Sequence, residues 1–324
     1  MNDGKKYEVR TDLALEARES FPGDGGEISG VSLREWHDQK SHVKLTEVKI
    51  LDKKGAEAMK KPQGTYLTLE ADQLAKEDED YHREISEELS KHIRDLIGTM
   101  MRRRMGEGGG PSSDPSKIRI LLAGLGNPQI TPDALGPRVA GQLQVTRHLK
   151  LQYGDNFCRE RHLPVLSAII PGVMAQTGME TSEILTGVIR ETRPDLLIVV
   201  DALAARSVRR LGTTIQLTDT GIHPGSGVGN YRNSLTEETL GIPVLAIGVP
   251  TVVGAAAIVH DAVDGMLRAM DEYGSMSEEQ QYGLIRDLME PEFISFYVTP
   301  PDVDEQVRRL SFTISEGIHM AVFP

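Results

Sequence analysis

The sequence predicts an α/β fold of three layers, in which a mostly parallel sheet has helices on both faces and a smaller N-terminal antiparallel β layer is added. Two observations lead to this prediction. Short runs of Ile, Leu and Val, bounded by Gly or Pro, recur in the second half of the chain, as in buried parallel strands. These runs alternate with stretches of helical periodicity, and that succession is typical of a parallel sheet covered by helices.

Composition sets the class of protein and its partners. The chain has 324 residues, of which 39% are hydrophobic and 26% charged, enough for one large α/β domain. A net charge of -12 argues against direct binding to nucleic acid or to anionic lipid. The N-terminus is polar and no apolar run is long enough to span a membrane, so we expect a cytoplasmic protein. A single cysteine, Cys158, excludes intrachain disulfides and cysteine-based zinc sites.

The first third of the chain contains few elements. Period-two patterns within 43–70 predict two strands joined by a loop, which would form the small antiparallel layer. Apolar residues at three- and four-residue steps predict one long helix over 72–105, and its final arginines are expected on a solvated last turn. The segment 106–116 has a turn-forming residue at nearly every position and is expected to be a flexible loop.

The remainder alternates between strands and helices. Strands are predicted near 118–123, 164–170, 196–200, 213–218 and 244–249. Helices are predicted at 132–150, 181–192 and about 255–272, with further helical patterning in 278–322.

Two apolar runs, 117–137 and 193–206, each deliver one aspartate at a predicted turn, Asp133 and Asp201. Reactive groups of α/β sheets gather at the carboxyl ends of strands, and two carboxylates brought together there suit general acid and base chemistry. Both have structural alternatives. Asp133 would complement the dipole of a helix capped by Thr131, and Asp201 would close a strand by bonding the next turn.

Two glycine-rich loops are candidates for binding. The first contains Gly126 and Asn127, but Gln129 replaces the third glycine of a dinucleotide fingerprint, so a nucleotide cofactor is disfavoured. The second, 218–230, is either a simple crossover or a wall that a peptide backbone approaches closely. Its candidate binding or supporting residues are His223, Gly225, Ser226 and Gly227. Ser226 lacks the flanking glycines of a nucleophile elbow, and His223 is either a metal ligand, an orienting donor or neither.

Three segments together, 7–18, 124–139 and 199–230, closely resemble the germination protease of spore-forming bacteria, an endopeptidase that degrades small acid-soluble spore proteins. The resemblance implies an atypical aspartic endopeptidase, made in the forespore as a zymogen and assembled as a homotetramer, with Asp133 and Asp201 as its catalytic pair. It also implies a fold like that of hydrogenase maturation endopeptidases, which hold a metal with carboxylates and a histidine. We expect neither a cofactor nor a resident metal here.

The resemblance also gives the N-terminal segment a role. Residues 11–17 look like the acidic, apolar, alanine-containing stretch that the family cleaves in its substrates, which implies self-processing between Asp12 and Leu13. The expected division is a propeptide at 1–12, an N-terminal segment at 13–105, a loop at 106–116 and a catalytic domain at 117–324. Two rival functions stay open: a metal-assisted endopeptidase using the two aspartates with His223, and a non-catalytic module that only binds peptides.

Overall fold

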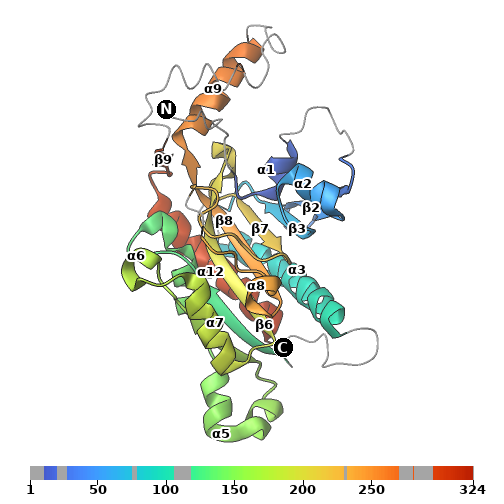
Figure 1. The fold of residues 1–324 in the computed structure, drawn as a ribbon, viewed down its shortest axis with the longest axis vertical. Helices are drawn as coiled ribbons and strands as arrows, with labels where there is room; N and C mark the ends of the chain where they lie inside the picture. Colours follow the sequence, from blue (N-terminus) through green and yellow to red (C-terminus); the bar gives the residue numbers. More distant parts are fainter. Residues whose placement is uncertain are drawn as a thin grey trace.

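A computed structural model describes residues 11–19, 28–74, 79–105, 118–229, 232–269, 280 and 295–323. It has an α/β architecture with helices on both faces of a single twisted sheet, which confirms the predicted fold class (Figure 1). Most of the expected propeptide, and the expected loop at 106–116, lie outside the described residues.

Nine strands of the described chain form one sheet in the order β1-β2-β3-β7-β8-β6-β4-β5, with β9 paired to β8. Their bounds are Val31–His37 (β1), Lys44–Ile50 (β2), Gly64–Glu70 (β3), Arg119–Gly124 (β4), Val165–Ile169 (β5), Leu196–Ala205 (β6), Thr214–Thr218 (β7), Val244–Gly254 (β8) and Tyr297–Val298 (β9). The group β8-β6-β4-β5 is parallel, and all the other pairings are antiparallel. The N-terminal strands were expected as a separate layer; instead they extend the same sheet, because β3 pairs with β7.

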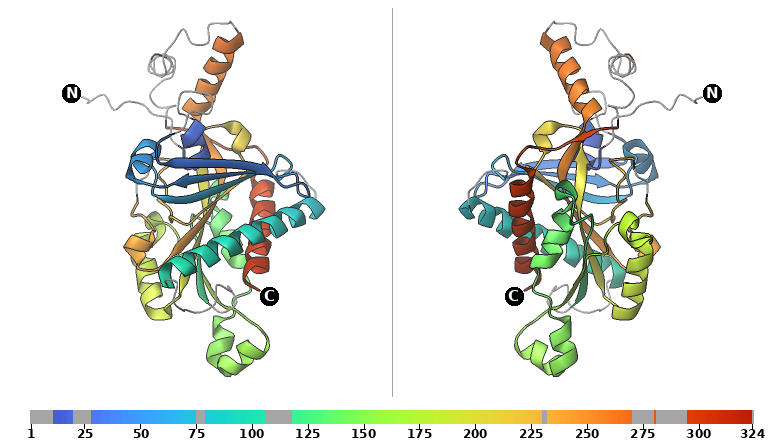
Figure 2. Two further views of the ribbon diagram at one scale, coloured as in Figure 1. Left: turned by 90° about the vertical axis from the view of Figure 1, so that its right-hand side faces the viewer. Right: turned by 90° about the vertical axis from the view of Figure 1, so that its left-hand side faces the viewer.

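Helices cover both faces of the sheet (Figure 2). The main ones are α1 (Ala14–Glu19), α2 (Lys53–Met59), α3 (Glu79–Met105), α4 (Leu135–Gln142), α5 (Arg147–Glu160), α7 (Thr181–Thr192), α9 (Ala255–Ala269) and α12 (Val303–Val322), and the short ones are α6 (Met174–Thr177) and α8 (Glu237–Leu240). The helices α3, α4 and α12 pack on one face, and α7 and α8 pack on the other. The carboxyl ends of the parallel strands point toward the end at which β8 runs into α9 (Figure 1).

Strand β6 shows why its sequence is a continuous apolar run. Leu196, Ile198 and Val200 face the core beneath α3 and α12, whereas Leu197 and Val199 face the core beneath α7. Because alternate side chains of a strand point to opposite faces and both faces here are covered, every position is apolar.

Several predicted elements have different bounds. The helix expected over 132–150 is a 3-10 turn followed by α4 and α5, because Thr146 interrupts it by bonding Leu166 and Pro164 of the neighbouring segment. The long helix begins at Glu79, seven residues later than predicted. The helix at 181–192 is confirmed. Of the helices in the described residues, none is long and apolar enough to cross a membrane.

Candidate active site

Asp133 lies in the connection between β4 and α4, and two glycines hold that connection against the sheet. A Cβ on Gly124 would collide with the backbone of Gly136, and a Cβ on Gly136 would collide with the carbonyl oxygen of Val200 in β6. The N–H of Leu125 also donates to that same oxygen, at 2.8 Å. Glycine thus permits an approach between α4 and β6 that a side chain would prevent, and this approach carries Asp133 toward β6.

The carboxylate of Asp133 is fixed by the loop itself. Its Oδ2 accepts a 2.7 Å hydrogen bond from the N–H of Asn127. Gly126 has φ of +108°, and a Cβ there would collide with the carbonyl oxygen of Asp133. Helix capping was the structural alternative for this region, but in this part of the described chain neither Thr131 nor Asp133 makes a side-chain cap. The side chain of Asn127 is turned to Gln129 and Gln176.

Asp201 lies within β6 and not at its end. The strand was expected to stop at residue 200 but runs on to Ala205, with a register irregularity between Leu203 and Ala204. Asp201 is 6% exposed, and its Oδ1 accepts a 2.9 Å hydrogen bond from the N–H of Ala202. The hydrogen bond to the next backbone N–H, which was the structural alternative to a catalytic role for Asp201, is therefore present, and the side chain is also almost completely buried.

Burial shifts the protonation of both aspartates in the same direction. Desolvation, followed by the negative charges of Asp133 and Asp12, raises the pKa of Asp201 well above its ordinary value. Desolvation also raises the pKa of Asp133, but the N–H of Asn127 and the charge of Arg232 oppose that rise. The arrangement thus favours a protonated Asp201 beside an Asp133 that ionises more readily.

The two aspartates line one cavity of about 410 Å³. Other lining residues come from the two glycine-rich loops, from the C-terminal part of β8 and from the N-terminal segment. They include Asp12, Gly126, Gly225, Arg232 and Thr251. Residues 68 positions apart in the sequence (201 minus 133) therefore share a site together with Asp12 of the predicted processing bond.

Asp12 lies beside β6 and hydrogen-bonds its backbone at Ala204, where the register of the strand is irregular. Its N–H donates to the carbonyl oxygen of Ala204 at 3.0 Å, and the N–H of Ala204 donates to its Oδ2 at 2.9 Å. The hydroxyl of Ser226 donates to Oδ1 of Asp12 at 2.7 Å. A Cβ on Gly227 would collide with the same carboxylate. The described part of this loop, 218–229, is therefore a wall against which the N-terminal segment lies.

The backbone that follows Asp12 is held on both sides of the predicted processing bond. The carbonyl oxygen of Asp12 accepts hydrogen bonds from Nζ of Lys61 at 3.0 Å and from Nε2 of Gln216 at 3.3 Å. The Oε1 of Gln216 accepts from the N–H of Ala14 at 2.7 Å. Leu13 is fully buried in an apolar pocket with Leu203, Leu211, Val253 and Ala257.

His223 borders a second cavity, of about 260 Å³, together with Lys61 and Gln216. Asp12 and Arg232 line both cavities, so the N-terminal segment lies where they meet. Desolvation and the charge of Lys61 lower the pKa of His223. Within the described residues no three His, Cys, Asp or Glu side chains converge as metal ligands, and His223 is not brought to the cavity of the aspartate pair.

Comparison with known proteins identifies the family. The model of the germination protease family matches residues 9–273. A germination protease from Caldanaerobacter subterraneus subsp. tengcongensis is 42% identical over 331 residues, which cover 98% of this chain and 94% of the relative. The germination protease from Clostridium tetani is 40% identical over 328 residues, 98% of this chain and 96% of the relative.

The chain belongs to the germination protease family. This confirms the resemblance drawn from three motifs, and it makes the chain a peptidase of germination. Among solved structures, the NiFe hydrogenase maturation protease HycI from Thermococcus kodakarensis KOD1 aligns with 62% of this chain and 92% of its own, at 18% identity and a TM-score of 0.29.

Sequence reasoning missed several polar groups of the candidate site in this germination protease. Lys61, Gln216 and Arg232 all line the cavities beside Asp12, and Thr251 donates to the carbonyl oxygen of Pro132 at 2.7 Å. Lys61 lies in the connection between α2 and β3, and Gln216 is a buried polar residue of β7. A glutamine between the apolar residues Ile215 and Leu217 of a predicted strand was the available signal, since a buried amide needs hydrogen-bond partners.

Proposed function

We propose that the chain is a spore endopeptidase that starts the degradation of small acid-soluble spore proteins during germination, by an atypical aspartic mechanism. We further propose that it is made as a zymogen that cleaves its own Asp12–Leu13 bond. One observation supports both proposals above all others: Asp12 lines the cavity that contains Asp133 and Asp201. The segment is bound by backbone hydrogen bonds and by a buried leucine, as a peptide substrate would be.

The proposed chemistry gives the two aspartates different roles. Asp133, whose charge is supported by the Asn127 N–H and by Arg232, acts as the base on a water molecule. Asp201, which is more deeply buried and holds its proton more strongly, donates to the leaving amine. Hydrolysis adds the water oxygen to the carbonyl carbon of Asp12, breaks the bond to the nitrogen of Leu13 and leaves a carboxylate and an amine.

Negative charge develops on the carbonyl oxygen of Asp12 during the attack. Lys61 and Gln216 already donate to that oxygen, so in this proposal they stabilise the oxyanion. They border the second cavity, whereas the aspartates border the first. In this proposal the carbonyl group is attacked from the cavity of the aspartates while its oxygen keeps the two donors.

The proposed zymogen follows from the same contacts. The chain's own segment 11–16 occupies the site, so a protein substrate reaches the aspartates only after that segment has left. Removal of residues 1–12 would begin that release. The family resemblance further supports a homotetramer in the forespore and spore core, and the charge of -12 supports a substrate met without its nucleic acid.

The decisive experiment follows the N-terminus of the purified chain at mildly acidic pH. Self-processing predicts a new N-terminus at Leu13, detected by N-terminal sequencing and mass spectrometry, and cleavage of added small acid-soluble spore protein. The Asp133→Asn and Asp201→Asn chains, shown by circular dichroism to be folded, are each expected to lose both activities by about 10²-fold or more. Near-normal activity in either variant overturns the aspartic mechanism. Binding of the substrate without any new N-terminus would instead indicate a peptide-binding module.

Chelation separates this proposal from the metal-assisted alternative. That alternative uses the carboxylates of Asp133 and Asp201 with His223, but His223 borders the other cavity. We therefore expect the chain to keep its activity after exhaustive dialysis against a chelator, and the His223→Ala chain to process itself. Loss of activity on chelation, with recovery on adding one defined divalent metal, would establish the metal mechanism.

A further inference from the structure

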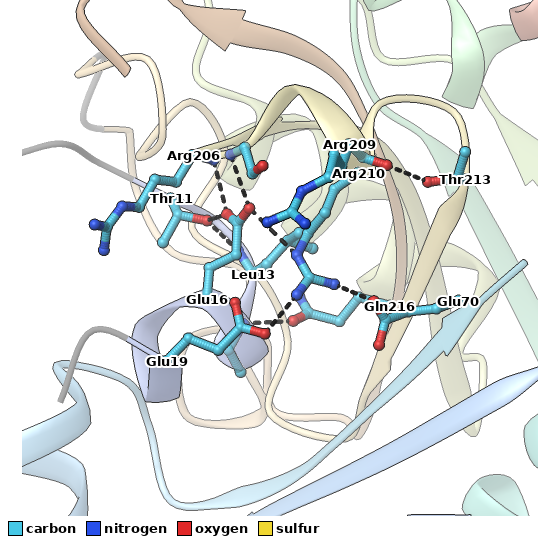
Figure 3. Close-up of polar contacts among 12 residues, drawn as sticks. Thr11, Leu13, Glu16, Glu19, Glu70, Arg206, Arg209, Arg210, Thr213 and Gln216 are labelled. Atoms are coloured by element: carbon cyan, nitrogen blue, oxygen red, sulfur yellow. Dashed lines mark hydrogen bonds and ion pairs between the residues drawn. The ribbon is translucent and has the colours of Figure 1, made fainter. Parts of the chain in front are cut away.

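The carboxylate of Glu16 is buried in a polar site of its own, four residues after Asp12. Glu16 is 2% exposed, and its side-chain oxygens accept hydrogen bonds from the N–H of Arg206 at 2.7 Å and from the N–H of Ser207 at 3.0 Å (Figure 3). The hydroxyl of Thr11 also donates to it. Two backbone donors aimed at one carboxylate form a cradle that suits an anion.

Arg210 supplies the positive charge of this site. Its Nε lies 3.4 Å from Oε1 of Glu16, and its other nitrogens pair with Glu70 at 2.5 Å and with Glu19 at 2.6 Å (Figure 3). Glu70 belongs to β3 and keeps Arg210 in place, whereas Glu16 and Glu19 belong to the N-terminal segment. When that segment leaves, Arg210 keeps its ion pair with Glu70 but loses those with Glu16 and Glu19. The N–H groups of Arg206 and Ser207 then lose the carboxylate that they bind.

The distance between the two acidic sites is set by a helical turn. Asp12 is paired with β6, whereas α1 begins at Ala14, and the N–H of Ala17 donates to the carbonyl oxygen of Leu13 at 3.2 Å. In a helical turn, residues three and four positions apart lie on the same side, so Glu16, four positions after Asp12, points to the same side of the segment as Leu13. An extended peptide would carry its fifth residue about 13 Å from its first, beyond that cradle.

We infer that Arg210, with the N–H groups of Arg206 and Ser207, is a specificity subsite for a glutamate four residues beyond the cleaved acidic residue, presented on a helical turn. The ligand class is thus a peptide with an acidic residue, an apolar residue and a second carboxylate at this spacing. This inference rests on the proposed function, because it takes Asp12–Leu13 as the cleaved bond.

The test uses a synthetic peptide that copies residues 7–20, and a matched peptide with glutamine at the Glu16 position. The self-processed chain is expected to lose about tenfold or more in kcat/KM on the glutamine peptide, mostly through KM, because the contact lies far from the reacting bond. The Arg210→Met chain is expected to treat the two peptides alike. The Arg209→Met chain, altered at the exposed neighbour on the same turn, is the matched control and keeps the wild-type ratio.

A second measurement does not need catalysis. In the Asp133→Asn chain, hydrogen exchange of the amides in 11–19 reports how firmly the resident segment is bound. Adding Glu16→Gln, which leaves Arg210 in place, is expected to speed that exchange about tenfold or more, whereas adding Arg209→Met leaves it unchanged.

The outcomes separate the two proposals. A wild-type preference below about twofold, or unchanged exchange in the Glu16→Gln chain, overturns the subsite. A full preference retained by a folded Arg210→Met chain also overturns the role of Arg210. Faster exchange without any cleavage of either peptide supports the subsite and overturns the proposed function.

Discussion

The hydroxyl of Ser226 donates a 2.7 Å hydrogen bond to the carboxylate of Asp12, across 214 residues of sequence. Ser226 is the serine of the glycine-rich wall, and it binds an acidic side chain beside the predicted processing bond. The Ala204 N–H donates to the other carboxylate oxygen at 2.9 Å, so two donors bind the side chain of Asp12. Such contacts fix the position of the bond relative to the aspartates.

Removing the Ser226 hydroxyl should therefore slow self-processing. A hydrogen bond to a charged group contributes about 1.5–3 kcal/mol, so Ser226→Ala is expected to reduce the rate of Asp12–Leu13 cleavage about tenfold or more. Mass spectrometry of timed samples measures the rate. Ser32→Ala, on the exposed edge strand β1, is the control and should process at the wild-type rate. Equal rates in the two variants would show that Ser226 does not position the bond.

Lys61 tests the oxyanion site. Loss of one donor to a developing oxyanion costs about 10²–10³-fold in rate, so Lys61→Met should lower kcat on a peptide substrate by that factor with little change in KM. Lys61→Arg should recover part of the loss, since it restores a charged donor. Lys54→Met, on the exposed side of α2, should behave as wild type. A change confined to KM would assign Lys61 to ground-state binding instead.

Two glycines of α4 make a matched pair. Gly136→Ala places a methyl group against the Val200 carbonyl of β6, so it should destabilise the chain by about 1–3 kcal/mol and displace Asp133. Gly141→Ala meets nothing within 4 Å on the same helix and should stabilise the chain by about 0.5–1 kcal/mol. Denaturant unfolding measures both. Similar destabilisation in the two variants would mean that the close approach of α4 to β6 is not needed.

Protonation of Asp201 should make stability depend on pH. Its folded pKa lies above the ordinary value of 3.8, so the folded chain binds the proton more tightly. The stabilisation is fully present below that value and is lost as pH rises toward the raised folded pKa, with a limiting slope of about 1.4 kcal/mol per pH unit. We expect this loss in the Asp133→Asn chain, which does not cleave itself, and its absence in the Asp133→Asn, Asp201→Asn double variant. Parallel unfolding curves against pH would contradict the burial of an ionisable Asp201.

Local pattern predicted the parallel half of the fold well. The run 196–200 was recognisable as a strand because burial on both faces makes it continuously apolar, and 181–192 was recognisable as a helix because burial on one face gives it a helical period. The position of the N-terminal strands was not predictable in that way. Their place in the sheet depends on β3 pairing with β7, and even the paired residues nearest in sequence, Glu70 and Thr214, are 144 positions apart (214 minus 70). No periodicity encodes the partner of a strand.

The site divides along the same line. Asp133, Asp201 and the glycine-rich wall stand out in the sequence because they interrupt apolar runs or cluster turn-forming residues. Lys61 gives no such signal, since a lysine in a polar connection is ordinary until the fold brings it to within 3.0 Å of the Asp12 carbonyl oxygen. Arg210 likewise gains a role only when Glu16 and Glu70 reach it from distant segments.

The amino-acid sequence was enough to predict the residue types of the site, the family and the segment that the chain is expected to cut. The packed fold was needed to show that this segment lies in the cleft, that His223 borders the other cavity, and that the donors to the Asp12 carbonyl come from Lys61 and Gln216. Periodicity and turn chemistry act between neighbours in the chain, whereas hydrogen bonds and desolvation depend on distances that only the packed fold sets.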